Sequence, residues 1–192
     1  MEKKIASELI YDGKIIKVYK DKVICENGNE ATREVVRHHG GVGVLAVVEN
    51  KILLVKQYRY PNATDTLEIP AGKLELNENT EICALRELEE ETGYSAKSID
   101  KIAKFLPTPG YSDEWLYIYE AKDVFKVENP RACDEDEEIE VIAMDIDEAY
   151  QKVVSGEIFD SKTMIAIMHA YINKSKSWDL LFKYKKSSVE QN

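Results

Sequence analysis

The spacing of apolar and polar residues changes once along the chain, and this change separates predicted strands from a predicted helix. Up to residue 72, short apolar segments alternate with turn residues, a pattern typical of strands. The predicted strands are residues 15–19, 22–25, 32–37, 41–48, 51–57 and 67–69. The first three, with a turn at residues 27–29, indicate a small antiparallel β subdomain over residues 1–40.

A helix is predicted at residues 80–92, because this segment is rich in Ala, Leu and Glu and contains neither Pro nor Gly. Gly93 follows at the position of a C-terminal capping glycine. Further strands are predicted at residues 99–106, 114–121 and 140–144, and helices at 147–155 and 161–173. Residues 161–163 are expected to cap the last helix. Residues 41–192 therefore read as one α/β domain with a mixed sheet.

Composition narrows the class of protein. The 192 residues carry a net charge of −10, which argues against binding to nucleic acid or to an anionic membrane. No apolar segment approaches the roughly 20 residues of a membrane helix, and the N-terminus lacks the apolar core of a secretory signal. Cys25, Cys83 and Cys133 have no zinc-site spacing and are expected to be buried free thiols. These features predict a cytoplasmic protein.

The predicted helix at 80–92 gathers acidic residues on one side. On a wheel of about 100° per residue, Glu87, Glu90 and Glu91 share one arc. The opposite side holds the apolar residues Ile82, Ala84, Leu85 and Leu88. Like charges three and four residues apart repel each other by a few tenths of a kcal/mol. Such a face is either solvated or neutralised by a cation, and carboxylate oxygens suit Mg²⁺ or Mn²⁺.

The segment that leads into this helix completes a longer pattern. Residues 72–94 read Gly72, five residues, Glu78, seven residues, and then Arg-Glu-Leu-Glu-Glu-Glu-Thr-Gly-Tyr. This resembles the Nudix box, G-x5-E-x7-R-E-U-x-E-E-x-G-U, in which U is aliphatic. Every fixed glycine and polar position matches, and only Tyr94 departs, at a packing position.

The resemblance implies an α/β/α sandwich and the hydrolysis of nucleoside diphosphates that are linked to another moiety. It also implies a set of metal ligands for Mg²⁺ or Mn²⁺: the backbone oxygen of Ala71 and the carboxylates of Glu87, Glu90 and Glu91. Arg86 would orient the glutamates, and Glu78 would brace the loop. Metal ions would neutralise the pyrophosphate, which an acidic protein could not otherwise hold.

Segments outside the box narrow the resemblance to ADP-ribose pyrophosphatases. The matching segments are residues 33–37, 54–59 and 67–72. Pro109 lies 15 residues beyond Tyr94, where that subfamily has a proline. The expected reaction is therefore hydrolysis of ADP-ribose to AMP and ribose 5-phosphate. The alternatives are another nucleotide derivative, such as a nucleotide sugar, NADH or a damaged triphosphate, and a non-catalytic sensor of ADP-ribose.

The subfamily resemblance also implies a general base on an acidic loop before a late strand. Here the loop is residues 134–138, and Glu137 is the first choice with Glu135 the second, since consecutive acids leave the alignment open. Glu90 is expected beside the metal. Arg33 and Arg59 are expected to contact phosphate and ribose, because a guanidinium offers paired donors, although a surface salt bridge is the alternative for Arg59. Glu68 would hold ribose hydroxyls or water.

Dimerisation is a further expectation from the subfamily. The resemblance implies a homodimer whose N-terminal strands exchange between subunits, so that Arg33 or Tyr19 would act on the partner's site. His38 and His39 are interpreted as structural, because no Ser, Cys or Asp partner is recognisable near them in the sequence.

Overall fold

The computed structural model describes the backbone of residues 1–133 and 138–189, with side chains in these ranges up to residue 175. The strands are β1 (Lys3–Asp12), β2 (Lys17–Ile24), β3 (Glu30–Arg37), β4 (Gly41–Leu45), β5 (Val47–Val48), β6 (Lys51–Arg59), β7 (Thr64–Glu68), β8 (Ala71–Lys73), β9 (Tyr94–Phe105), β10 (Leu116–Lys126) and β11 (Glu140–Asp145). The helices are η1 (Tyr60–Asn62), α1 (Thr80–Thr92), α2 (Ile146–Ser155) and α3 (Ser161–Val189).

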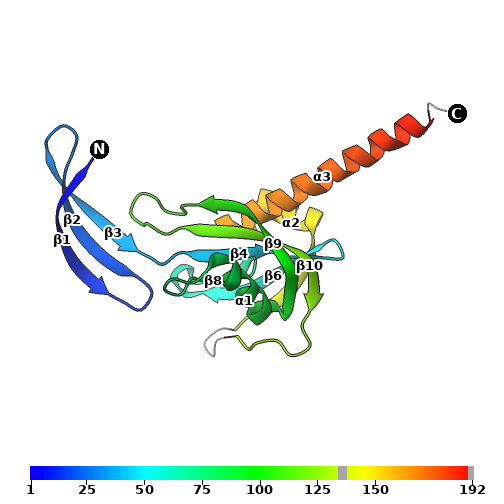
Figure 1. Ribbon diagram of the computed structural model, residues 1–192, viewed down its shortest axis with the longest axis horizontal. Helices are drawn as coiled ribbons and strands as arrows, with labels where there is room; N and C mark the ends of the chain where they lie inside the picture. Colours follow the sequence, from blue (N-terminus) through cyan, green and yellow to red (C-terminus); the bar gives the residue numbers. More distant parts are fainter. Residues whose placement is uncertain (134–137, 190–192) are drawn as a thin grey trace.

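The first three strands form an antiparallel sheet of their own, in the order β1-β2-β3, which extends away from the rest of the molecule (Figure 1). The predicted break between residues 19 and 22 was wrong, because β2 is continuous, and β1 was not predicted. Two register shifts in β1, between Lys4 and Ala6 and between Leu9 and Tyr11, interrupt its alternation. All ten residues of β1 are exposed, so no buried face marks the strand in the sequence.

The body of the molecule contains two further sheets. Their strand orders are β8-β4-β10-β9 and β11-β6-β5, with β7 paired to β6. β4 and β10 are parallel, with Val42 opposite Tyr117, whereas the other pairs in these sheets are antiparallel. The expected α/β sandwich with a mixed sheet is therefore confirmed. The expected strand over residues 41–48 is divided at Ala46, whose carbonyl oxygen accepts from Leu53 N–H at 2.9 Å.

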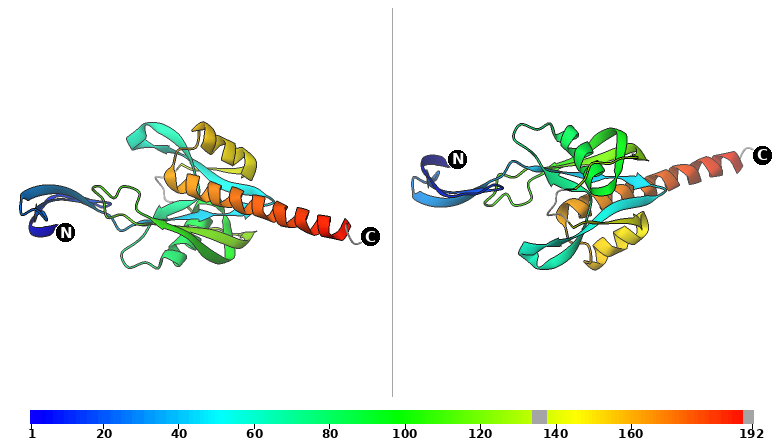
Figure 2. Two further views of the ribbon diagram at one scale, coloured as in Figure 1. Left: turned by 90° about the horizontal axis from the view of Figure 1, so that it is seen from above. Right: turned by 90° about the horizontal axis from the view of Figure 1, so that it is seen from below.

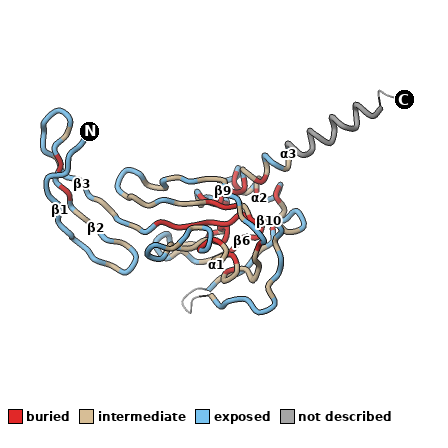
Figure 3. The backbone as a smooth tube through the Cα atoms, viewed as in Figure 1, coloured by how far each residue is buried: buried red, intermediate tan, exposed pale blue. Residues whose placement is uncertain are grey.

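Alternation along β4 builds two cores. Val42 and Val44 pack in a cluster with Ala84 and Leu88 of α1, whereas Leu45 packs in a cluster with residues of α2 and α3. The helices thus cover opposite sides, and α2 lies beside α3 (Figure 2). Burial is concentrated in this body, while the N-terminal sheet is largely exposed (Figure 3). A fully buried side chain such as Leu88 contributes about 1.5–3 kcal/mol relative to its exposed state.

The helices differ from prediction at their ends and faces. α1 has the predicted bounds, and Gly93 ends it in the left-handed region at φ 72°. Ile82 was expected on the apolar face but is 65% exposed, and the buried Cys83 packs there. α3 does not end near Asn173 but continues to Val189, because no Gly or Pro lies between them.

Two smaller expectations also change. The first turn of α3 is capped by Asp160, not by residues 161–163, since Asp160 Oδ2 accepts from Thr163 N–H at 3.0 Å. Of the three free cysteines only Cys83 is buried, while Cys25 and Cys133 are partly exposed. Within the described residues, no helix has both the length and the apolar character needed to cross a bilayer.

Candidate functional site

The acidic face of α1 is held in place by both ends of the helix and by its buried side. Asn79 Oδ1 accepts from the N–H groups of Glu81 and Ile82 at 2.8 and 3.2 Å and so caps the first turn. At the other end, Gly93 N–H donates to Glu89 O at 2.9 Å. With Leu88 buried in the core, the helix turns its glutamates toward β8 and the loop that follows it.

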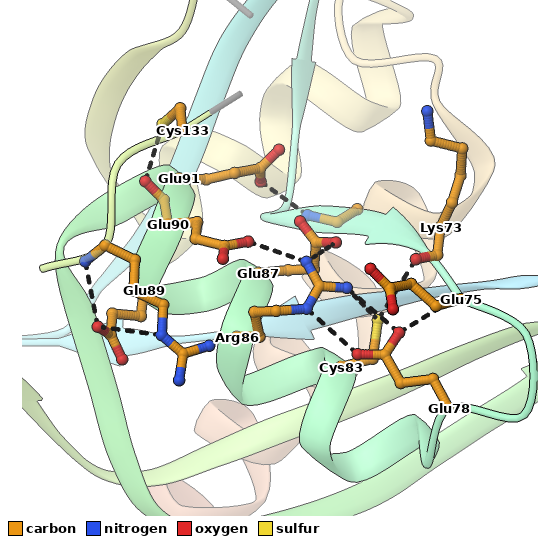
Figure 4. Close-up of polar contacts among 12 residues, drawn as sticks. Lys73, Glu75, Glu78, Cys83, Arg86, Glu87, Glu89, Glu90, Glu91 and Cys133 are labelled. Carbon is orange, nitrogen blue, oxygen red and sulfur yellow. Dashed lines mark hydrogen bonds and ion pairs between the residues drawn. The ribbon is translucent and has the colours of Figure 1, made fainter. Parts of the chain in front are cut away.

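Arg86 is the centre of an ion-pair cluster on this face (Figure 4). Its Nη1 donates to Glu87 Oε1 at 2.8 Å and to Glu90 Oε2 at 2.9 Å. Nε and Nη2 each reach a Glu78 carboxylate oxygen at 3.2 Å. Burial alone would lower the pKa of Arg86. The hydrogen bonds to Glu78 and the charge of Glu87 have the larger effect and raise the pKa of Arg86 above its ordinary value. Arg86 therefore stays charged and sets the spacing of three carboxylates.

Glu78 also fixes the loop before α1. Its Oε2 accepts from the backbone N–H of Glu75 at 3.0 Å. Burial alone would raise the pKa of this carboxyl. The hydrogen bonds from Arg86 and Glu75 have the larger effect, so the pKa of Glu78 lies below its ordinary value. The side chain stays ionised and joins the loop to Arg86, in the position that a bracing residue would occupy.

The backbone at Ala71 and Gly72 passes directly beneath two of the glutamates. A Cβ atom added to Gly72 would lie 1.9 Å from the carboxyl carbon of Glu87, so any other residue here would displace that carboxylate. The neighbouring Ala71 N–H donates to Glu91 Oε2 at 2.8 Å, and Glu91 is 5% exposed. The glutamates and this backbone segment therefore approach each other as closely as packing allows.

The donor set at this point fits a hard divalent cation. Glu87, Glu90 and Glu91 present carboxylate oxygens from one helix face beside the backbone of Ala71, and Mg²⁺ and Mn²⁺ prefer such oxygens. Among the described residues, no three acidic, His or Cys side chains are already grouped as ligands. The reason is visible in the contacts, because Glu87 and Glu90 turn to Arg86 and Glu91 turns to Ala71.

Two cavities open on either side of Gly72. One, of about 330 Å³, is lined by Lys14, Ile15, His38, His39, Gly72, Lys73, Leu74, Glu75, Arg86, Glu87 and Glu90. The other, of about 410 Å³, is lined by Ile15, His38, Gly41, Val42, Gln57, Arg59, Ala71, Gly72, Lys73, Glu91, Pro107, Glu114, Leu116, Asp160, Ser161 and Lys162. The two share Ile15, His38, Gly72 and Lys73, so a two-lobed ligand could occupy both with its middle at the glutamates.

A buried ion-pair network lies beside the second cavity. Glu68 pairs with Arg59 from β6 and with Lys162 from α3. Burial alone would raise the pKa of the Glu68 carboxyl. The hydrogen bond from Arg59 and the charge of Lys162 have the larger effect, and the net result is a pKa lowered to about 2. Glu68 is thus a permanent anion held between two cations.

His38 borders both cavities but is engaged by the protein. Its Nδ1 accepts from Gly40 N–H at 3.0 Å and lies 3.4 Å from Glu114 Oε1. Its backbone N–H donates to Asp113 Oδ1 at 3.0 Å, and Asp113 also pairs with Arg37. These contacts agree with the structural role expected for His38, while the following residue, His39, is exposed.

The predicted site residues are brought together only in part. Arg59, Ala71 and Glu91 border the second cavity, and Arg86, Glu87 and Glu90 border the first. Arg33 lies apart in the N-terminal sheet, where its Nε donates to Glu2 Oε2 at 3.1 Å. Pro109 is exposed, and Pro107 lines the cavity instead. Glu135 and Glu137 lie outside the described residues.

The segment just before residue 134 is described, and it lies against the C-terminal turn of α1. Arg131 N–H donates to Glu89 Oε1 at 3.2 Å, and the Cys133 thiol donates to Glu90 O at 2.8 Å. The described segment that precedes the predicted base loop therefore contacts the C-terminal turn of the acidic helix. This adjacency could not be seen in the sequence, because 42 or more residues separate the partners.

Sequence reasoning did not identify Lys162 as a site residue. It joins the network only because α3 returns to β7, and Lys162 and Glu68 are 94 residues apart. The available signal was weak: a lysine in the first turn of a helix, where the helix dipole disfavours a positive charge, suggests a specific anionic partner. Glu114 and Gln57 were likewise not identified.

Comparisons with known proteins agree with this geometry. A family model described as the NUDIX domain matches residues 37–164, and one described as the nucleoside diphosphate sugar hydrolase N-terminal domain matches residues 2–36. An ADP-ribose pyrophosphatase of Bacillus subtilis (strain 168) is 45% identical over 175 residues, which is 91% of this chain and 95% of the relative.

A protein named methanol dehydrogenase activator, from Bacillus methanolicus, is 43% identical over the same shares of the two chains. Among solved structures, one described as an ADP compounds hydrolase superposes with a TM-score of 0.77. It covers 91% of this chain and 95% of that one at 16% sequence identity, so it shows a shared fold.

Gly72→Ala tests whether the glutamates and the backbone form one cation site. The added methyl group would overlap the Glu87 carboxyl and displace it, so we expect the affinity for Mn²⁺ to fall by about 10–100-fold. Isothermal titration with Mn²⁺ measures this, and thermal unfolding checks the fold. Gly110→Ala is the control, because its Cβ would meet nothing within 4 Å. Unchanged Mn²⁺ affinity in Gly72→Ala would remove Glu87 from the site.

Proposed function

The chain belongs to the Nudix hydrolase family, and on this basis we propose that it cleaves the pyrophosphate bond of ADP-ribose to give AMP and ribose 5-phosphate. The observation that carries the proposal is the pair of cavities that meet at Gly72, beside Glu87 and Glu91. ADP-ribose has two bulky ends joined by a pyrophosphate. Its two ends would fill the two cavities, and its phosphates would lie at the glutamates.

The reaction needs a divalent cation, as is general in this family. Glu87, Glu90, Glu91 and the backbone oxygen of Ala71 would hold it, and when bound it neutralises charge on the phosphate oxygens and promotes attack by water. We propose Mg²⁺ or Mn²⁺ from the oxygen donors. Arg86 pairs with Glu87 and Glu90 and fixes their spacing before the cation arrives.

The chain's own residues bind and orient the substrate. Arg59 borders the larger cavity, and its guanidinium would donate to a phosphate oxygen. Lys14 and Lys73 border the smaller cavity and would add positive charge near the other end of the substrate. Both cavities therefore combine cationic side chains with carboxylates of α1.

Water attack also needs a group that accepts its proton. We propose Glu137, with Glu135 as the second choice. The support is the resemblance of the acidic loop and the contact of the preceding residues, Arg131 and Cys133, with the end of α1.

We also propose a homodimer built through the N-terminal sheet. β1 exposes Ile5, Leu9, Ile10 and Tyr11, each between 45% and 57%. Large apolar side chains exposed on a sheet are typical of a surface that meets another protein. A second copy of this chain would cover it, and Arg33 or Tyr19 of one subunit would then reach the partner's site.

A substrate panel tests the activity. The protein is incubated with ADP-ribose, NADH and GDP-mannose, each with Mg²⁺ or with EDTA, and products are separated by ion-exchange chromatography. We expect metal-dependent AMP from ADP-ribose at a rate well above the others. Preference for GDP-mannose would instead follow the nucleoside diphosphate sugar hydrolase family matched at the N-terminus. ADP-ribose that binds without cleavage would indicate a sensor.

Glu91→Gln tests the cation ligands. The amide keeps the volume and can still accept from Ala71 N–H, but it removes the charge, so turnover should fall by about two orders of magnitude or more. The melting temperature should stay close to that of the parent protein. Glu81→Gln, on the same helix but exposed, should leave turnover unchanged. Near-normal turnover in Glu91→Gln would contradict the assignment.

Ile10→Glu tests the dimer. Because Ile10 is 57% exposed in the single chain, the charge disturbs only an interface, so light scattering should find a dimer for the parent protein and a monomer for the variant. Ile172→Glu, on α3 and 51% exposed, is the control and should remain a dimer. A monomeric parent protein would refute the proposal.

A further inference from the structure

The carboxylate of Glu68 has no hydrogen-bonding capacity left for a substrate. Its Oε1 accepts from Arg59 Nε at 2.7 Å and from the Thr66 hydroxyl at 2.6 Å. Its Oε2 accepts from Arg59 Nη2 at 2.6 Å and from Lys162 Nζ. A carboxylate has about four acceptor positions, and all are used here by the protein. The side chain is also only 3% exposed.

Arg59, in contrast, bonds to Glu68 through only one edge of its guanidinium. Nε and one N–H of Nη2 face Glu68, and this leaves the outer edge, with three of the five N–H groups. Within the described residues these three donate to no protein atom, and the side chain is 40% exposed. Arg59 also lines the cavity of about 410 Å³. Glu68 thus fixes the plane of the guanidinium and leaves its outer edge available to a ligand in that cavity.

The same carboxylate reaches α3. Lys162 is 11% exposed and contacts both Glu68 and Asp160. Next to it, the Thr163 hydroxyl accepts from Ile69 N–H at 2.9 Å and donates to Asp160 Oδ2 at 2.5 Å. The first turn of α3 is therefore joined at two adjacent places to the segment that continues, through Ala71, to Glu91.

We propose that Glu68 is a positioning residue that acts through Arg59 and Lys162 and makes no contact with substrate itself. It aligns the phosphate-binding edge of Arg59 and ties the start of α3 to the site. The inference rests on the proposed function, in which Arg59 binds a phosphate, and it replaces the sequence-based expectation that Glu68 holds ribose hydroxyls or water.

Without Glu68 the guanidinium would rotate freely, and its free edge would face the phosphate only part of the time. A misplacement of about 1 Å at a reacting group costs up to about 100-fold in rate. For Glu68→Gln we therefore expect kcat/KM with ADP-ribose to fall by about 10–100-fold. Asp65→Asn is the matched control, because Asp65 lies on the same strand and pairs with Lys56, but on the surface, and it should behave as the parent protein.

A double-mutant cycle separates positioning from direct contact. If Glu68 acts through Arg59, Glu68→Gln should cost much less in an Arg59→Ala background than alone. An equal loss in both backgrounds would show that Glu68 does not act through Arg59 and would overturn the proposal. So would unchanged kcat/KM with only a lower melting temperature, since that is the result of a purely structural role. Should Glu68→Gln not fold, Glu68→Asp, which keeps the charge but is shorter, is measured against the same criteria.

A spectroscopic measurement tests the geometry without any substrate. The Nε–H of Arg59, bonded to a buried carboxylate, should give a resolved, slowly exchanging signal in a ¹H–¹⁵N correlation spectrum, assigned by its loss in Arg59→Lys. In Glu68→Gln this signal should move and exchange with water at least tenfold faster. An unchanged signal would overturn the proposal. A changed signal in a protein that cleaves no ADP-ribose would leave the positioning role standing and reject the substrate.

Discussion

The backbone segment between Glu68 and Gly72 is clamped between two helices, and the candidate site depends on this constraint. α3 holds its beginning through Lys162 and Thr163, and α1 holds its end through the bond from Ala71 N–H to Glu91. Each bond joins a buried or half-buried group to one that is far away in the sequence. Breaking the bond at Ile69 or at Ala71 would take the partner from a backbone N–H group, and a buried donor without a partner costs about 1–3 kcal/mol. The segment is therefore held in a fixed position beside the glutamates of α1.

The second constraint is electrostatic. Among the residues that the structure describes, Glu78, Glu87 and Glu90 all pair with Arg86, and Glu91 is buried beside them. Excess negative charge in a half-buried site raises the free energy of the folded protein, because water screens it poorly. A divalent cation would offset that charge. Natural proteins accept such local instability at functional sites, and here it occurs on a helix whose cap, core packing and C-terminal glycine are otherwise favourable.

Local features of this chain could be predicted from the sequence, and features made by distant contacts could not. The bounds of α1 and the role of Gly93 follow from propensity and spacing within a few residues, so they were predicted correctly. β1 has no buried face, and the alternation that would reveal it is broken by register shifts. The pairing of Lys162 with Glu68 bridges 94 residues and depends on the path of α3, which no short-range pattern records. The resemblance to the Nudix box pointed to the carboxylates of α1, but it gave no information on Lys162.

Side chains of opposite charge from different elements meet at the cavity of about 410 Å³, and this explains why the distant contacts matter. The carboxylates that would hold a cation come from one helix, whereas Arg59 and Lys162 come from a strand and another helix. Glu68 engages one edge of Arg59 and the ammonium of Lys162, so both cations already pair with a carboxylate outside α1. A phosphate chain at Gly72 would then meet the other edge of Arg59 and the metal ligand Glu91 at the same cavity.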